Sequence, residues 1–172
     1  MTLAKGLTGA ALPLGAVVLS EAMAGRVEHR MLHTGLTYCG HPLACAAGVA
    51  ALDAYGDERL IERSRALGAR MKAELDRLAD RHPVVGDVRG GHGLFAVLEL
   101  VSDRADRTPL APWSQTPAAL KDLVDAAMDE GVSFATRGHL ILLAPPLVIE
   151  ERELDEALAL LDRLLSRHFP AA

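Results

Sequence analysis

The order of amphipathic segments in the second part of the chain limits its fold more than any other feature. Residues 57–79 carry apolar side chains at helical spacing, and residues 84–88 and 94–100 are strand-like segments joined by a glycine-rich turn. A second helix, a second strand pair and a final amphipathic helix over residues 150–167 follow. The repeated order of helix and two strands predicts a compact α+β unit whose small sheet is covered by helices.

The second helix of this pattern has recognisable start and stop signals. Thr116 is expected to cap it, with Pro117 in the first turn and Gly131 near the end. Residues 132–136 and 140–143 then form either another strand pair or one bent strand.

The first third of the chain has a different pattern. Residues 14–20 predict a short buried strand, and the alanine-rich segment from Pro42 to Ala54 predicts a helix that is apolar nearly all round and must pack on several sides. A lone strand leaves its hydrogen-bonding edges unsatisfied. We therefore expect an α/β fold in two parts. Residues 1–56 would be the C-terminal end of a larger α/β domain whose beginning is absent, and residues 57–172 would be a small α+β domain.

Composition narrows the classes of function. Half of the 172 residues are hydrophobic, which is enough for a core, and the formal charge of −5 argues against nucleic acid as a main partner. Cys39 and Cys45 lack a second ligand pair, so we expect two free thiols, no metal site and a cytoplasmic location. The sequence shows no leader and no apolar run of membrane-spanning length, so we expect no membrane partner.

Lys5 differs from the other two lysines of the chain. Lys72 and Lys121 lie in charged helical patterns, whereas Lys5 lies among small and apolar residues. A lysine that is desolvated and held by a tight backbone loses part of its preference for the charged form, and its amine then becomes a nucleophile that forms Schiff bases. The alternative is a lysine near the chain end that is frayed in solvent. The local sequence leaves both interpretations open.

Several short motifs occur together in one order. They are Leu3-Ala4-Lys5-Gly6-Leu7, Leu12-Pro13-Leu14-Gly15-Ala16, Thr37-Tyr38-Cys39-Gly40-His41-Pro42, Gly86-Asp87-Val88-Arg89-Gly90, Glu99-Leu100 and Ala144-Pro145-Pro146-Leu147. In order and spacing they resemble the class III aminotransferases, which are pyridoxal-phosphate enzymes of fold type I. The similarity is greatest to the taurine–pyruvate and ω-amino acid branch. It covers essentially the whole chain but only the C-terminal portion of a full-length member.

The resemblance assigns roles to two residues of the first part. Lys5 would form the Schiff base with pyridoxal 5′-phosphate and then move the proton between the substrate and the cofactor. Thr37 would donate a hydrogen bond to the cofactor phosphate of the neighbouring subunit, which implies a homodimer with a shared active site. The alternative for Thr37 is a loop threonine that satisfies its own backbone.

The resemblance also makes Arg137 a candidate substrate-binding residue. A guanidinium holds a carboxylate through two parallel hydrogen bonds. Many ω-amino acid members have their arginine two residues earlier, where this chain has Ala135. Positions two apart on a strand share a face, so Arg137 is expected to serve the same pocket. The alternative is an exposed arginine at a strand end.

Four other residues receive weaker assignments. Arg89, in a glycine-rich turn one residue longer than the common pattern, is expected to bridge the small and large domains. Glu99 is expected to be a packing or ion-pair residue. His41 is expected to shape its loop rather than act as a base, and Trp113 with its loop is a candidate for closing the entrance.

The function implied is an aminotransferase that moves an amino group from an amino acid or ω-amine donor to an oxo acid, pyruvate or 2-oxoglutarate. The phosphate loop and the aspartate that pairs with the pyridine nitrogen lie upstream of the lysine in the family. Met1 is therefore expected to mark a truncated, split or misannotated gene. The alternatives are a non-catalytic fragment, a subunit that needs a separate N-terminal piece, or a decarboxylase or aminomutase of the same family.

Overall fold

The computed structural model describes residues 1–31 and 33–170. The chain divides into two compact units, Met1–Leu60 and Ile61–Ala172. The assignment of residues 1–56 to a cofactor-binding domain stays a prediction. The mixed α and β content of the described chain confirms the fold class expected from the sequence.

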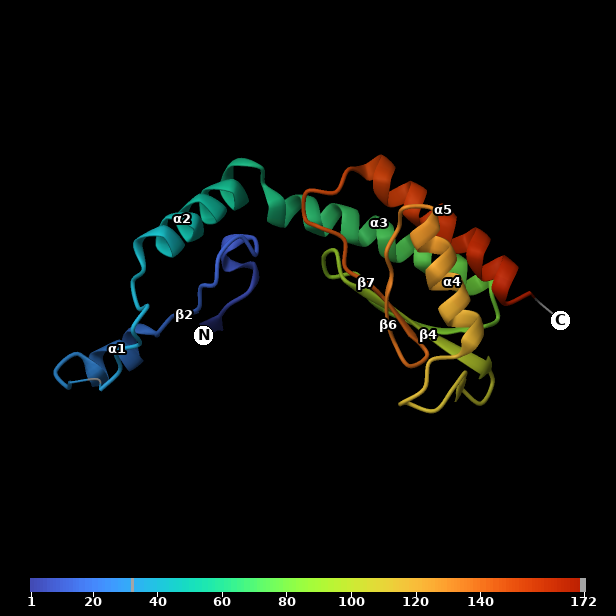
Figure 1. The fold of residues 1–172 in the computed structure, drawn as a ribbon, viewed down its shortest axis with the longest axis horizontal. Coiled ribbons are helices and arrows are strands. Elements are labelled where there is room, and N and C mark those ends of the chain that lie inside the picture. Colours follow the sequence, from blue (N-terminus) through green and yellow to red (C-terminus); the bar gives the residue numbers. More distant parts are fainter. Residues whose placement is uncertain (32, 171–172) are drawn as a thin grey trace. The chain divides into compact units, whose positions relative to one another are not determined.

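The second unit is an antiparallel sheet with helices on one side (Figure 1). Its strands follow the order β3-β4-β7-β6, and a short fifth strand, β5, pairs with β4. The residues of this region thus form the two expected strand pairs. The elements are α3 (Leu60–Arg81), β3 (Val85–Gly90), β4 (Ala96–Asp103), β5 (Thr108–Pro109), α4 (Ala118–Asp129), β6 (Ala135–Arg137), β7 (Leu140–Leu143) and α5 (Glu151–His168).

The core lies between the sheet and helices α3, α4 and α5. Strand β4 turns Leu98 and Leu100 inward, where they are fully buried with Ile141 of β7. The apolar stripe predicted for α3 is buried as expected, because the helical period places its members on one face. That stripe consists of Leu60, Leu67, Met71, Leu75 and Leu78.

The glycine-rich turn between β3 and β4 packs closely against α3. Gly90, Gly91 and Gly93 all have positive φ, which side-chain-bearing residues rarely adopt. A Cβ added at Gly68 of α3 would lie 2.2 Å from the Gly93 carbonyl oxygen. The Oγ of Ser64, one turn earlier, accepts a hydrogen bond from the Leu94 N–H at 3.1 Å. The turn is therefore seated on the helix by backbone contact.

The start of α4 differs from expectation. Pro117, and not Thr116, is the N-cap residue, and no side chain caps the helix. Proline fixes φ near its helical value, so it can begin the helix without the threonine hydroxyl. Helix α5 has a complete capping box instead, formed by Glu150 and Glu153.

The first unit is the shorter of the two. It contains β1 (Thr2–Leu3), η1 (Gly6–Thr8), β2 (Ala16–Val17), α1 (Glu21–Val27) and α2 (Pro42–Asp57). Strands β1 and β2 pair antiparallel over two residues each.

Two predictions for the first unit were wrong for the described structure. The buried strand over residues 14–20 is reduced to β2, and Val17 is 67% exposed. Helix α2 buries only its small residues Ala44 and Gly48, with the Leu14 side chain against Gly48. An apolar helix buries only the side that another segment contacts, and in the described residues α2 is contacted by η1 and by Leu14.

Gly68→Ala tests the seat of the glycine-rich turn. Alanine favours helix by about 1 kcal/mol over glycine, but here its methyl group meets backbone that cannot turn aside, a clash that costs roughly 1–3 kcal/mol. We expect a net loss of stability in urea unfolding followed by far-UV circular dichroism. Ala73→Gly, at an exposed position of the same helix, measures the difference in helix propensity between alanine and glycine without a clash. A more stable Gly68→Ala protein would contradict the contact.

Candidate active site

Lys5 occupies a strained backbone position between β1 and η1. Its φ is 59° and its ψ is −94°, a region that residues with a side chain seldom enter. Such strain persists only where surrounding structure enforces it, and it is concentrated at functional sites. The tight backbone expected around Lys5 is therefore present. The expected desolvation is not, because the Lys5 side chain is exposed in the described structure.

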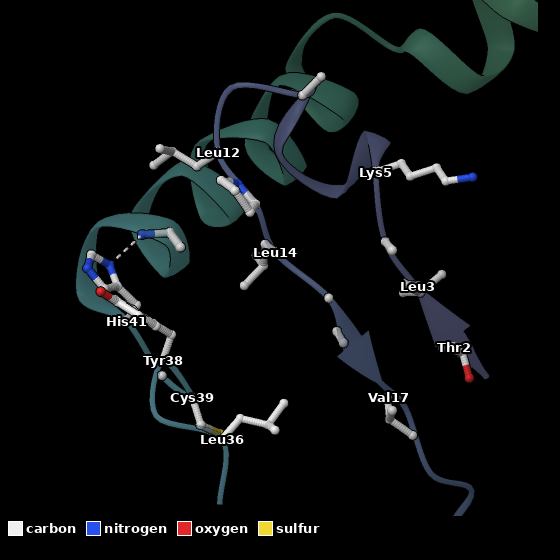
Figure 2. A pocket seen from close by; sticks show the side chains of 17 residues that line it. Thr2, Leu3, Lys5, Leu12, Leu14, Val17, Leu36, Tyr38, Cys39 and His41 are labelled. Atoms are coloured by element: carbon white, nitrogen blue, oxygen red, sulfur yellow. Dashed lines mark hydrogen bonds between the residues drawn. The ribbon is translucent and has the colours of Figure 1, made fainter.

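A cavity of about 1280 Å³ opens beside this position. Its walls come from β1, β2, the segment that joins them, the 36–41 turn and the start of α2. Most lining side chains are apolar, including Leu3, Leu14 and Leu36, and Figure 2 shows Leu14 between the strand segments and the turn. The Lys5 side chain extends away from Tyr38 and His41 in the same view.

The turn before α2 is ordered by short-range contacts. The Ala44 N–H donates to Nδ1 of His41 at 3.5 Å, so His41 is the N-cap of the helix, and Pro42 follows at its first position. The ring of Tyr38 lies 5.6 Å from that of His41 between centroids. These contacts agree with the expectation that His41 shapes the loop. Thr37 is exposed on the same turn and does not line the cavity.

The second unit presents a different group of polar residues, on the sheet face away from the helices. Pairing in register places Asp87, Glu99, Leu140 and Arg137 in one row across the four strands. Ala135 lies two residues before Arg137 on β6, and therefore on the same face. Both are exposed. The shared face expected for these two positions is thus present.

Arg89 forms ion pairs with two acidic residues of this face. Its Nη1 contacts the Glu99 carboxylate and lies 2.9 Å from Asp87 Oδ2. The hydrogen bond from Arg89 holds the pKa of Glu99 below its usual value, and the same bond raises the pKa of Arg89. Nε2 of the buried His139 lies 3.5 Å from the other Glu99 oxygen. Glu99 is thus an ion-pair residue, as expected, while the bridging of domains by Arg89 stays a prediction.

Arg137 has a different environment. Its guanidinium carbon lies 5.4 Å from the centre of the Trp113 ring, within the range of a cation–π contact. Within residues 1–31 and 33–170, no carboxylate forms an ion pair with it. The contact with Trp113 was missed from the sequence, because these residues are far apart along the chain and carry no shared motif.

Metal-binding clusters and membrane-spanning helices are both absent from the described part of the chain. It contains no group of three histidine, cysteine or acidic side chains arranged to hold a metal ion, and Cys39 and Cys45 are free and exposed. None of its helices has the length and apolar character to cross a bilayer.

The sequence profile of the family "Aminotransferase class-III" matches residues 1–165, nearly the whole chain. The chain therefore belongs to the class III aminotransferases. The family's enzymes depend on pyridoxal phosphate. This confirms the family resemblance seen in the sequence motifs.

Individual relatives agree with this assignment. The chain is 39% identical to the aminotransferase YhxA of Bacillus subtilis, covering 90% of this chain and 35% of that protein. It is 36% identical to an omega-aminotransferase of Caulobacter vibrioides, covering 96% and 36%. A solved structure of taurine:2-oxoglutarate aminotransferase from Bifidobacterium kashiwanohense, in complex with PLP and glutamate, matches with a TM-score of 0.88 at 35% identity, covering 96% and 37%. The chain therefore spans about a third of the length of the relatives it matches.

Arg89→Gln tests the charge pairing on the open sheet face. Without the guanidinium, the pKa of Glu99 should rise toward its ordinary value, and carbon-13 NMR of the carboxyl groups measures it directly. A lowered folded-state pKa contributes stability above the unfolded pKa, and this is lost as the pH falls through the folded pKa. The variant should therefore be less stable than the unchanged chain at neutral pH. Below the folded-state pKa of Glu99, the two proteins should differ little in stability. Arg152→Gln, which removes an exposed pair with Glu156, is the control. An unchanged Glu99 pKa would contradict the pairing.

Proposed function

We propose that this chain is the lysine-bearing part of a pyridoxal-phosphate-dependent aminotransferase that moves an amino group from an amino acid or ω-amine donor to an oxo acid. The observation that carries the proposal is the strained backbone of Lys5 beside an apolar-walled cavity, within the segment that matches the family. Strain at a lysine that packs into no core is difficult to explain by stability alone.

The residues of the first unit fit the cofactor in size and chemistry. The cavity is large enough for a ligand of that size, and its apolar walls suit an aromatic ring. No carboxylate in the described residues forms an ion pair with the Lys5 amine, whereas Lys72 is bound by Asp76 at 2.6 Å. Lys5 therefore has an amine free to condense with an aldehyde. When bound, pyridoxal phosphate supplies an electron sink for the bonds at the substrate Cα.

The chain's own residues then have separable tasks. Lys5 Nζ would hold the cofactor covalently and, once released, would take the proton from the substrate Cα. The Thr37 hydroxyl would donate a hydrogen bond to the phosphate bound by the partner subunit, which is consistent with its exposed position outside the cavity lining. This role requires a homodimer in which two chains complete each site.

Arg137 is proposed to bind the acidic group of a substrate. Its guanidinium lies on the open sheet face without an acidic partner in the described chain, so its donors are available to a carboxylate or sulfonate. One similar solved structure is named for such compounds, a taurine:2-oxoglutarate aminotransferase, and one relative is named an omega-aminotransferase. The proposed donor is thus an ω-amino acid or a taurine-like amine, and the acceptor is pyruvate or 2-oxoglutarate.

One observation favours a second candidate function, a subunit that acts only with another polypeptide. The first unit leaves many large apolar side chains more than two-fifths exposed, which is unusual for a free surface. They include Val17, Val18, Leu19, Leu36, Leu43, Val49 and Leu52. Sedimentation of the purified chain tests this second candidate, because a subunit that needs another polypeptide should aggregate by itself, whereas a chain that needs none should give one defined species.

Labelling with pyridoxal phosphate and borohydride tests Lys5. The amine condenses with the aldehyde and releases water, and borohydride then reduces the carbon–nitrogen double bond so that the product survives digestion. Because Lys5 is exposed and water can hydrolyse the unreduced bond, we expect no stable absorption band from this chain alone. Mass spectrometry should nevertheless find the reduced group on Lys5 well above Lys72 and Lys121. Equal labelling of the three lysines would contradict the proposal.

Arg137→Gln tests the substrate role. Hydrogen bonds to a charged group contribute about 1.5–3 kcal/mol, so KM for an acidic substrate should rise roughly ten- to a hundredfold in the cofactor-loaded enzyme. The turnover of a donor without an acidic group should change little. Arg152→Gln is the control for loss of one exposed positive charge. If KM for the acidic substrate is unchanged, Arg137 lies outside the binding site.

A further inference from the structure

Trp113, the only tryptophan of the chain, has a large apolar ring that is nevertheless exposed. This ring contacts Arg137. The residue is 60% exposed, so its role is not that of a core side chain. The Arg137 guanidinium lies against the ring at 5.4 Å from its centre. A guanidinium that stacks on an aromatic ring uses its flat face, and the N–H groups at its edge remain free.

The backbone at Trp113 is held in place by contacts other than the cation–π attraction. A Cβ added at Gly138, in the turn after β6, would lie 2.7 Å from the Trp113 carbonyl oxygen. Gly138 also has a φ of +61°, so this turn and the Trp113 loop fit together closely. The loop is closed by a hydrogen bond from the Gln115 N–H to the Pro112 carbonyl at 2.9 Å.

The acidic residues nearest along the sheet do not compete for Arg137. Arg89 contacts both Asp87 and Glu99, and Leu140 lies between Glu99 and Arg137 in the cross-strand row. Of the two arginines on this face, Arg89 is paired with carboxylates, and the guanidinium of Arg137 has no hydrogen-bond or ion-pair partner among residues 1–31 and 33–170. A free guanidinium edge of fixed orientation is what bidentate binding of an anion needs.

We propose that Trp113 is a positioning residue for Arg137, and that its ring fixes the guanidinium so that the N–H edge receives the carboxylate or sulfonate of the substrate. This inference rests on the proposed anion-binding role of Arg137. It goes further by assigning the orientation of the guanidinium to a residue that does not itself bind the anion.

The test uses site-resolved labelling of arginine in the full chain. Phenylglyoxal modifies accessible guanidinium groups, and mass spectrometry after digestion gives the rate at Arg137. Succinate, and separately methanesulfonate, is titrated at constant ionic strength, and slowing of the Arg137 reaction gives the binding constant. Arg152 serves as an internal control that neither anion should protect.

Trp113→Leu removes the ring, and Trp113→Phe retains an aromatic face. An exposed cation–π contact corresponds to about a two- to fivefold change in affinity, so the leucine variant should need that much more succinate for equal protection of Arg137. The phenylalanine variant should recover most of the difference. Circular dichroism should give the same spectrum for all three proteins, because the ring is exposed and outside the core.

The possible failures are distinct. If Trp113→Leu has the same binding constant as the unchanged chain, the positioning role is wrong and the anion-binding role of Arg137 stands. If both variants lose affinity equally, the effect is structural and the positioning role is again wrong. If Arg137 of the unchanged chain is not protected, its anion-binding role fails and the inference fails with it. The labelling of Lys5 is independent of all three outcomes.

Discussion

The arrangement of the second unit depends on strand β4, whose side chains alternate between the buried and the exposed face of the sheet. Successive side chains of a strand point to opposite faces, so Leu98 and Leu100 enter the core while Glu99 stays on the open face. The same strand pairs with β3 on one side and β7 on the other, and its register sets which residues of those strands accompany Glu99. A slip of one residue would exchange the two faces and place a carboxylate among leucines. Burial of the leucines therefore fixes the arrangement of charges on the exposed side.

That arrangement separates the two arginines of the open face. Arg89 contacts two carboxylates, which raises its pKa and lowers that of Glu99. Arg137 lies beyond Leu140 in the same row and contacts an aromatic ring instead. Arg89 is thus shared by two carboxylates, and among the described residues Arg137 has no acidic partner at the other end of the row. The unpaired charge of Arg137 therefore depends on Arg89, which occupies the two nearby carboxylates, as well as on Arg137 itself.

The sequence was a good guide where side chains are buried by their own unit and a poor one elsewhere. The helix and strand periods of residues 57–172 predicted α3, α5 and both strand pairs, because each apolar stripe meets another within the unit. In the first unit the apolar pattern predicted burial, but Val17 and most of α2 are exposed. A hydrophobic pattern shows which side chains favour burial, but a side chain is buried only where another segment packs against it.

The candidate site likewise has features that the sequence predicted and features that it did not. Lys5 was identified by its motif and its unusual neighbours, but no residue type around it signals a positive φ. The expected desolvation of its side chain was wrong for the described chain, since small apolar neighbours do not by themselves enclose an amine. The contact between Trp113 and Arg137 joins a loop to a strand that follows a whole helix later, and only the three-dimensional fold brings them together.

The presence of a single tryptophan has a practical consequence. Indole emission responds to charge and polarity near the ring, and here all of it comes from a residue in contact with Arg137. A compound that alters the charge at this arginine would therefore change the fluorescence of the entire protein without any added label. The chain contains its own optical reporter at the place where substrate selection is proposed to occur.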